Sequence, residues 1–297
     1  MTLSIQPIDP VSRPFFGGEV SGIDITRRLT PEQAASIEKG MDRFGVLVFH
    51  GQHFEDESQL AFSRNFGRLE EASGDLNWGK PRRIESALVN DISNLDNDNK
   101  VLPPDSRRRL FSLGNRLWHS DSSFKEVPAK FSLLSARSIP SSGGNTEFAD
   151  MRAAYDTLDD EMKAEIQDLV CEHSQMFSRS LIGFADFTDE DRARFKPVLQ
   201  RLVRTHPSTG RQSLYLASHA GSIVGWPVPE ARALLRDLIE HATQRKFVYA
   251  HAWKQWDLVM WDNRATMHRA RPFDPKQVRD MHRTTVGCER STMAEAA

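Results

Sequence analysis

Residues 117–124 of the chain have the sequence LWHSDSSF, the stretch from which both the fold and the chemistry can be argued. In an extended strand, side chains two positions apart leave the same face, so His119 and Asp121 can point at one metal ion. A third ligand must then come from another strand. Residues 261–268, with the sequence WDNRATMH, offer His268 just beyond an apolar run. Two imidazoles and one carboxylate occupy one face of an octahedron and leave three positions open, an arrangement typical of non-haem Fe(II) oxygenases.

Each half of this pattern also has an ordinary structural interpretation. A histidine and an aspartate two positions apart can form a hydrogen-bonded couple at a strand end, and the chain has 10 histidines. His268 can equally be a solvent-facing turn histidine, because typical turn residues precede it. Three hydroxyls near the first pair are candidates to orient metal ligands: Ser120, Ser122 and Ser123.

The composition favours a folded protein with a small-molecule ligand. The chain has 297 residues and a formal charge of -2, so no strong field attracts nucleic acid or an anionic membrane. Cys171 and Cys288 are the only cysteines, which argues against a disulfide framework and for a reducing compartment. Neither a signal peptide nor a membrane span is recognisable. The sequence therefore predicts a cytoplasmic protein without nucleic-acid or membrane partners, and leaves a homo-oligomer open.

The apolar pattern predicts a mostly β protein with α additions. Short apolar runs typical of strands are separated by turn residues; they cover residues 45–49, 131–136, 145–148, 202–203, 213–216, 247–249, 258–261 and 284–286. Helical spacing and capping signals predict helices at about 31–43, 55–66, 151–169 and 232–241. Two strand-rich parts around one helical insert suggest a barrel or jelly roll with helices packed outside.

We expect a single domain over residues 1–297 with two additions. Residues 70–115 carry many charges and the run Arg107–Arg109, which predicts a long surface excursion. Excursions of this length are often binding loops or lids, and a loop without a role is the plainer alternative. The second addition is a helical insert at about 150–200, whose last part, from residue 177, is predicted to be a charged connection.

Two arginines follow the second histidine motif. Arg279 and Arg283 are four positions apart, so on a strand their side chains share a face and can enter one cavity. A guanidinium is a planar fork of donors that suits a carboxylate. The alternative is a pair of solvated arginines on a charged strand.

With these motifs the chain resembles the taurine / 2,4-dichlorophenoxyacetate dioxygenase family of Fe(II)- and 2-oxoglutarate-dependent oxygenases. Within it, the chain looks most like the 2,4-dichlorophenoxyacetate branch. The resemblance extends through nearly the full length. Its most specific segments are residues 117–124, 143–148, 150–155 and 261–269.

The resemblance implies a double-stranded β-helix, or jelly-roll, core with flanking helices and one iron at its open end. It also implies which residues hold the metal and the cosubstrate. The implied Fe(II) ligands are His119, Asp121 and His268. The implied 2-oxoglutarate residues are Thr146 and Arg279 at the distal carboxylate, with Asn115 and Arg283 near the keto-acid end. In family members the counterpart of Arg283 also meets the anionic group of the prime substrate.

The implied reaction uses dioxygen, converts 2-oxoglutarate to succinate and CO2, and hydroxylates a small organic acid. An aryloxyacetate such as 2,4-dichlorophenoxyacetate is the favoured substrate, which suggests a role in aromatic herbicide degradation. Hydroxylation beside the ether oxygen gives a hemiacetal that collapses to a phenol and glyoxylate. The alternatives are a sulfonate (taurine-type) dioxygenase, a non-catalytic jelly-roll binding protein, and zinc-dependent hydrolysis at the same ligands.

One segment departs from the family pattern. Members often place a basic or imidazole side chain shortly after the segment that matches residues 66–69, where this chain has EEASGD at 70–75. Acidic side chains there would repel an anionic substrate. Five basic residues are candidates to compensate, each with a structural or solvated role as the alternative: Lys80, Arg82, Arg83, His206 and His219.

Overall fold

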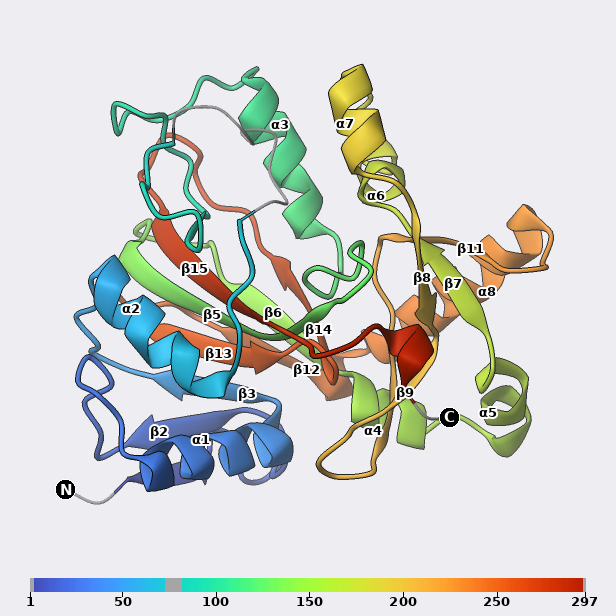
Figure 1. Ribbon diagram of the computed structural model, residues 1–297, viewed down its shortest axis with the longest axis horizontal. Coiled ribbons are helices and arrows are strands. Elements are labelled where there is room, and N and C mark those ends of the chain that lie inside the picture. The colour runs from blue at the N-terminus through green and yellow to red at the C-terminus, as the bar shows by residue number, and fades with distance from the viewer. Residues whose placement is uncertain (1–2, 73–81, 296–297) are drawn as a thin grey trace.

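The computed structural model describes residues 3–72 and 82–295, which contain four sheets; two large facing sheets lie centrally, and the sheet of β7, β8 and β11 lies to the right in Figure 1, among helices. This arrangement agrees with the expected sheet-based protein with helical additions. Of the residues considered above, Lys80 and residues 73–75 lie outside the described part.

A seven-stranded sheet forms the frame, in the strand order β1-β2-β3-β13-β5-β15-β4. The strands are β1 (Ser4–Pro7), β2 (Gly18–Ser21), β3 (Val46–Phe49), β13 (Leu258–Asp262), β5 (Ala129–Ser138), β15 (Asp280–Gly287) and β4 (Asn90–Asp91). Neighbouring strands are antiparallel, except that β2 and β3 are parallel. Strand β13, at the centre, is buried throughout, as expected for a continuous apolar run.

Alternation along β3 shows that the frame has two buried faces. Val46 and Val48 pack in one apolar cluster, whereas Leu47 and Phe49 pack in another. Successive side chains of a strand point to opposite sides of a sheet, so the two clusters lie on opposite faces.

Helices cover the face to which Leu47 points. Helix α1 (Pro31–Phe44) begins after Thr30, whose side-chain oxygen accepts a hydrogen bond of 3.2 Å from the Gln33 N–H. This is the capping box that the sequence predicts. Helix α2 (Asp56–Ser63) contributes to the same apolar cluster as α1 and continues into the 3-10 helix η1 (Arg64–Phe66) (Figure 1).

A three-stranded sheet packs against the opposite face of the frame. Its order is β12 (Val248–His251), β6 (Thr146–Asp150) and β14 (Thr266–Ala270). The ring of Phe148 on β6 lies 5.4 Å from that of Trp261 on β13. The space between the two sheets is therefore filled by apolar side chains.

The chain between β6 and β12 forms a second group of elements. Its helices are α4 (Met151–Asp156), α5 (Asp160–Ile166), α6 (Gln175–Ser180), α7 (Asp189–Arg194), α8 (Val228–Ala242) and η3 (Arg245–Phe247). Its strands are β7 (Val170–His173), β8 (Val198–Arg201), β9 (Val203–Thr205), β10 (Gln212–Leu214) and β11 (Ala220–Ile223), arranged as β11-β7-β8 and β10-β9.

Two predictions for this group are wrong in detail. The helix expected at 151–169 is two helices, because Asp159 accepts a hydrogen bond of 2.7 Å from the Met162 N–H and starts a new helix there. The charged connection expected from residue 177 contains α7 and β8. Charges on α7 are solvated or paired while Phe195 is buried, so a high charge content here does not indicate a loop.

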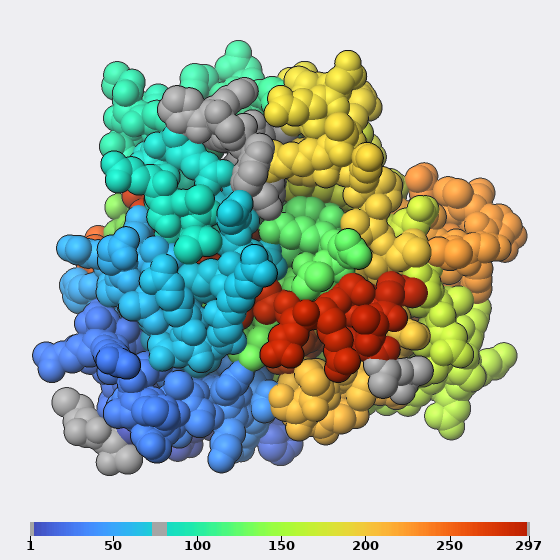
Figure 2. All heavy atoms as spheres, viewed as in Figure 1, coloured from blue at the N-terminus to red at the C-terminus, as the bar shows by residue number. Residues whose placement is uncertain are grey.

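The described part of residues 70–115 packs against the frame. It contains β4 and helix α3 (Arg107–Ser112), followed by the 3-10 helix η2 (Leu113–Arg116). Phe111 of α3 packs against Phe184, with ring centroids 5.5 Å apart. Figures 1 and 2 show this teal segment beside the yellow segment of α6 and α7 at the top of the molecule.

The last helix of the described chain is the 3-10 helix η4 (Thr292–Ala294), which follows β15. Within residues 3–72 and 82–295, none of the helices has the length and apolar character needed to span a bilayer. Cys171 and Cys288 are both free thiols, and burial raises the pKa of Cys171 to about 12.

Candidate metal centre

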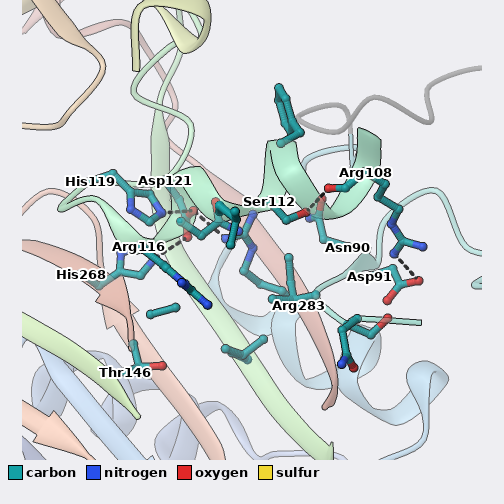
Figure 3. A pocket seen from close by; sticks show the side chains of 18 of the residues that line it. Asn90, Asp91, Arg108, Ser112, Arg116, His119, Asp121, Thr146, His268 and Arg283 are labelled. Atoms are coloured by element: carbon teal, nitrogen blue, oxygen red, sulfur yellow. Dashed lines mark hydrogen bonds and ion pairs between the residues drawn. The ribbon is translucent and has the colours of Figure 1, made fainter. Parts of the chain in front are cut away.

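His119, Asp121 and His268 come together in the structure as the sequence predicts (Figure 3). One ligand atom from each lies within 4.8 Å of the others. The backbone brings them together, because His119 and His268 form an antiparallel bridge with N–H to carbonyl distances of 3.0 and 2.8 Å. All three are buried. His268 is therefore a residue of β14 that faces the site and not a solvent-facing turn histidine.

The donor atoms of this cluster suit a divalent metal. The Nε2 atoms of His119 and His268 lie 3.8 and 3.7 Å from the carboxylate oxygens of Asp121, too far for hydrogen bonds. Burial lowers the pKa of both histidines, so their rings are neutral at pH 7. Burial works to raise the pKa of Asp121, but Arg283, the two neighbouring histidines and the hydrogen bond from Ser132 together outweigh it and hold that pKa well below its usual range. Two neutral imidazoles and one carboxylate fit Fe(II).

Hydrogen bonds around the cluster orient these side chains. His119 Nδ1 lies 2.8 Å from the carbonyl of Leu117, to which it donates when Nε2 carries the lone pair. The hydroxyl of Ser132 donates to Asp121 Oδ2 at 2.8 Å, and Asn263 Nδ2 donates to that hydroxyl at 2.9 Å. The backbone N–H of Asp121 donates to Asn263 Oδ1 at 3.0 Å. Ser132 and Asn263 therefore fix the carboxylate.

The expectation that neighbouring serines orient the ligands is wrong. The hydroxyl of Ser120 donates to backbone carbonyls and that of Ser122 to Glu70, while Ser123 has no hydrogen-bond partner among the described residues. Ser132 was missed because its role depends on the pairing of β5 with β13. Asn263 was interpreted only as a turn residue, although its place directly after a buried strand was a usable signal.

A cavity of about 210 Å³ opens beside the metal cluster. It is lined by all four residues that the resemblance implies for 2-oxoglutarate. Thr146 begins β6, Asn115 lies in η2, Arg279 precedes β15 and Arg283 lies within it. The structure thus brings together residues that are far apart in the chain.

Arg279 is a buried cation without an acidic partner in the described structure. Its guanidinium makes one long hydrogen bond, of 3.4 Å, to the carbonyl of Ile92. Burial lowers the pKa of Arg279 to about 10, so the group remains charged at pH 7. Thr146 accepts a hydrogen bond of 3.0 Å from the Trp253 indole, which leaves the proton of its own hydroxyl for a ligand. A buried charge needs a counter-ion, and this cavity can admit one.

Arg283 and Asn115 have different surroundings. Arg283 Nη1 donates to Asp121 Oδ1 at 2.6 Å, so this arginine is paired with a residue of the metal cluster (Figure 3). The amide oxygen of Asn115 accepts a hydrogen bond of 3.4 Å from Arg179 Nη2.

The five basic residues that could offset the acidic segment at 70–75 lie in different parts of the structure. Lys80 is outside the described residues. Arg82 and Arg83 do not line the cavity, and two aspartates bind Arg83. His206 lies 3.0 Å from a buried carboxylate in the core. Of these five, His219 is the one that the structure places at the cavity wall.

The acidic segment does not present a free charge at Glu70. Its carboxylate accepts hydrogen bonds from the Lys125 ammonium at 2.6 Å and the Ser122 hydroxyl at 2.8 Å. Lys125 thus offsets the expected repulsion at this position. A buried arginine of the cavity, Arg179 on α6, has no signal in the sequence, because it lies in the part predicted to be a charged connection.

Comparison with known proteins identifies the class. The family described as "Taurine catabolism dioxygenase TauD, TfdA family" matches residues 4–285, and the chain belongs to this family. The chain is accordingly an Fe(II)- and 2-oxoglutarate-dependent dioxygenase that uses dioxygen and acts on a small molecule. The resemblance is confirmed, and the non-catalytic and zinc-hydrolase alternatives are set aside.

Individual relatives are similar over nearly their whole length. The alpha-ketoglutarate-dependent 2,4-dichlorophenoxyacetate dioxygenase of Burkholderia sp. (strain RASC) is 45% identical over 272 residues, covering 92% of this chain and 91% of the relative. The (S)-phenoxypropionate/alpha-ketoglutarate-dioxygenase of Sphingobium herbicidovorans is 37% identical over 288 residues, covering 93% and 92%. The crystal structure of AAD-2 with Mn(II) and N-oxalylglycine has a TM-score of 0.94 at 59% identity, covering 98% of this chain and 100% of that one.

Proposed function

We propose that the enzyme hydroxylates aryloxyacetates such as 2,4-dichlorophenoxyacetate. The observation that carries this proposal is the cavity, which combines the metal cluster and buried arginines with apolar walls that include Phe111, Leu113 and Phe124. A ligand with one carboxylate and one aromatic ring suits such walls. Relatives at 45% identity are named for 2,4-dichlorophenoxyacetate, which adds support.

We propose His119, Asp121 and His268 as the Fe(II) ligands. Their neutral nitrogens and ionised carboxylate fit the metal, as the hydrogen bonds and burial described above indicate. Bound Fe(II) supplies the redox chemistry that activates dioxygen. Ser132 and Asn263 hold the carboxylate in place for it.

For 2-oxoglutarate, we propose that Arg279 and Thr146 bind the distal carboxylate. Arg279 supplies the charge and the Thr146 hydroxyl a hydrogen-bond donor. Asn115 and Arg283 then lie at the keto-acid end, consistent with the contact between Arg283 and the metal cluster. The protein holds both molecules in one orientation and keeps water from the reacting carbon.

The products follow from the position of the new hydroxyl group. On the carbon that bears the ether oxygen, hydroxylation gives a hemiacetal, which collapses to a phenol and glyoxylate. Succinate and CO2 form from 2-oxoglutarate in the same cycle. The role proposed for the enzyme is degradation of aromatic herbicides.

A substrate panel tests this function. The enzyme is assayed with Fe(II), ascorbate and 2-oxoglutarate against aryloxyacetates, aryloxypropionates, cinnamates and sulfonates, with succinate and phenol as readouts. We expect phenol and succinate in equal amounts from 2,4-dichlorophenoxyacetate, and neither from His119→Ala or Asp121→Ala. Retained activity in both variants would remove these residues from the proposed ligand set. Sulfite from taurine without phenol from aryloxyacetates would instead support the sulfonate alternative.

We further propose that residues 1–297 form one domain built on a double-stranded β-helix. Two facing, mainly antiparallel sheets with a shared apolar core and the metal cluster beside β14 support this. We also infer a cytoplasmic enzyme without nucleic-acid or membrane partners, since both thiols are free and the charge is -2.

A further inference from the structure

Arg179, near the end of α6, is a second buried cation of the cavity without an acidic partner. Its side chain is 4% exposed. Nη1 donates to the Ser178 hydroxyl at 3.1 Å and Nη2 to the Asn115 amide oxygen at 3.4 Å. Nε has no hydrogen-bond partner among the described residues. Both partners are neutral, so in the described structure the guanidinium charge lacks a counter-ion.

The protein holds this guanidinium at the cavity wall. Its carbon lies 4.4 Å from the centre of the Phe111 ring, on whose face it packs. Gly114 leaves the space that the group occupies, because a Cβ atom there would lie 2.3 Å from Nη1. Arg179 and His119 line the same cavity, and after burial the charge of Arg179 helps to lower the pKa of His119. The cation is therefore near the metal cluster.

Other deeply buried arginines of the described chain have carboxylates beside them. Arg152 pairs with Asp150 and Arg264 with Asp262. Arg179 and Arg279 lack such a partner, and burial lowers the pKa of each to about 10, so both stay charged at pH 7. A buried unpaired charge is unfavourable for folding. Both unpaired arginines line the cavity, which indicates that bound anionic ligands supply their counter-ions.

We propose that Arg179 binds the carboxylate of the prime substrate. The assignment rests on the proposed function, in which Arg279 is occupied by 2-oxoglutarate and a second organic acid enters the same cavity. Arg283 is engaged by Asp121, so Arg179 is the buried cation that remains for this acid. Its fork of donors suits a bidentate contact with a carboxylate. Arg179 thus makes up for the basic residue that the segment at 70–75 lacks.

Arg116 is one of several less buried cations at the cavity wall, with Arg109 and Arg271, and it is the competing residue that the variants test. It also lines the cavity, but its side chain is exposed to solvent. Water and salt screen an exposed charge, so Arg116 contributes less to binding an anion than a buried arginine does. Replacing Arg179 with Met should therefore weaken binding of the acid more than the matched replacement of Arg116 does.

Binding measurements without turnover test the proposal. The protein is loaded with Mn(II) and N-oxalylglycine, and 2,4-dichlorophenoxyacetate or its neutral amide is titrated in a calorimeter. For Arg179→Met we expect the Kd of the acid to rise about 30-fold or more, because one partner of a buried charge pair is lost. The Kd of the amide should be unchanged, and that of N-oxalylglycine should change far less than that of the acid, because Arg179 reaches the proposed cosubstrate site only through one long hydrogen bond to Asn115. Arg179→Lys should bind the acid with intermediate affinity.

Two further variants test whether the position of the Arg179 guanidinium matters and whether the effect is specific to an arginine of the cavity. Gly114→Ala pushes the guanidinium aside without removing its charge, so it should also weaken binding of the acid. Arg192→Met, at an exposed arginine of α7 outside the cavity, should leave it unchanged. Unchanged acid binding in Arg179→Met, with weakened binding in Arg116→Met, would overturn the proposal and leave the proposed function intact. Failure of the wild-type protein to bind any aryloxyacetate would overturn both.

Discussion

At Asp121, one carboxylate is held from two sides. Arg283 binds Oδ1, and Ser132 binds Oδ2 and is itself held by Asn263. Loss of a residue that orients a metal ligand typically lowers metal affinity about 10- to 100-fold. Ser132 therefore belongs to the proposed metal site, because its hydroxyl orients the carboxylate of Asp121.

Replacing Ser132 with Ala should weaken metal binding by about 10-fold or more, since Asp121 then loses a hydrogen bond that orients it. Mn(II) affinity measured by electron paramagnetic resonance checks this. Ser122→Ala is the control, because that hydroxyl binds Glu70 and not Asp121. Equal Mn(II) affinity in both variants would show that Ser132 does not contribute.

Thr146 provides a similar test for the cosubstrate. Thr146→Val keeps the shape of the side chain and removes its hydroxyl, so the 2-oxoglutarate carboxylate loses a donor. We expect the Kd of 2-oxoglutarate to rise about 10-fold, the effect of losing roughly 1–2 kcal/mol. Anaerobic titration of the Fe(II) protein, followed by absorbance, measures this Kd. An unchanged Kd would remove Thr146 from the cosubstrate site.

Among the elements, β15 is the frame strand that connects the metal cluster, through Arg283, with the segment at 82–115. It pairs with β5 and β4, and Asp280 at its start shares Arg83 with Asp91 of β4. His282, on the same strand, lies between Asp56 and Asp280. Burial works to lower the pKa of His282, but the contact with Asp280, the hydrogen bond to Asp56 and the negative charges of both aspartates together outweigh it and raise the pKa.

The raised pKa makes the contribution of His282 to stability depend on pH. A group whose pKa is higher in the folded state stabilises the fold fully below its unfolded pKa, about 6.5, and loses this effect as pH rises through the folded pKa. The Tm difference between the wild-type protein and His282→Gln should therefore be larger at pH 6 than at pH 9. Thermal denaturation at both pH values measures it. A difference that grows with pH would contradict the assigned contacts.

At the scale of the whole molecule, the C-terminal segment pairs with a buried arginine. Arg204 on β9 is buried, and its Nε donates to Glu295 Oε2 at 3.0 Å, with Nη2 bonded to the other oxygen. Burial works to lower the pKa of Arg204, but this pairing raises it. Glu295 is far from Arg204 in sequence, so the contact joins the second group of elements to the C-terminal segment.

Removal of the carboxylate by Glu295→Ala should lower the free energy of unfolding by about 2 kcal/mol, since a buried charged donor loses its partner. Urea denaturation with constant m value measures the change. Glu289→Ala, at an exposed position, is the control and should have little effect. A comparable loss in both variants would show that the pairing with Arg204 is not the cause.

Much of the fold and the site could be predicted from local signals. The capping box at Thr30 and the apolar run of β3 are encoded in consecutive residues, so these elements were found. The break between α4 and α5 was missed, because the apolar spacing continues through it while Asp159 caps a new helix. Ser132 was missed because its partner depends on strand pairing and not on local sequence.

By itself, the sequence determined the chemistry of the centre. His119, Asp121 and His268, with two arginines four positions apart, specify a metal and a carboxylate-bearing ligand, because residue type and spacing carry that information. Only the tertiary structure decided how these groups meet and which other cation lies with them. Arg179 is an ordinary arginine in the sequence, and burial without a counter-ion at the wall of the cavity distinguishes it. Burial and the absence of a partner are properties of the packed chain, since segments far apart in sequence create them together.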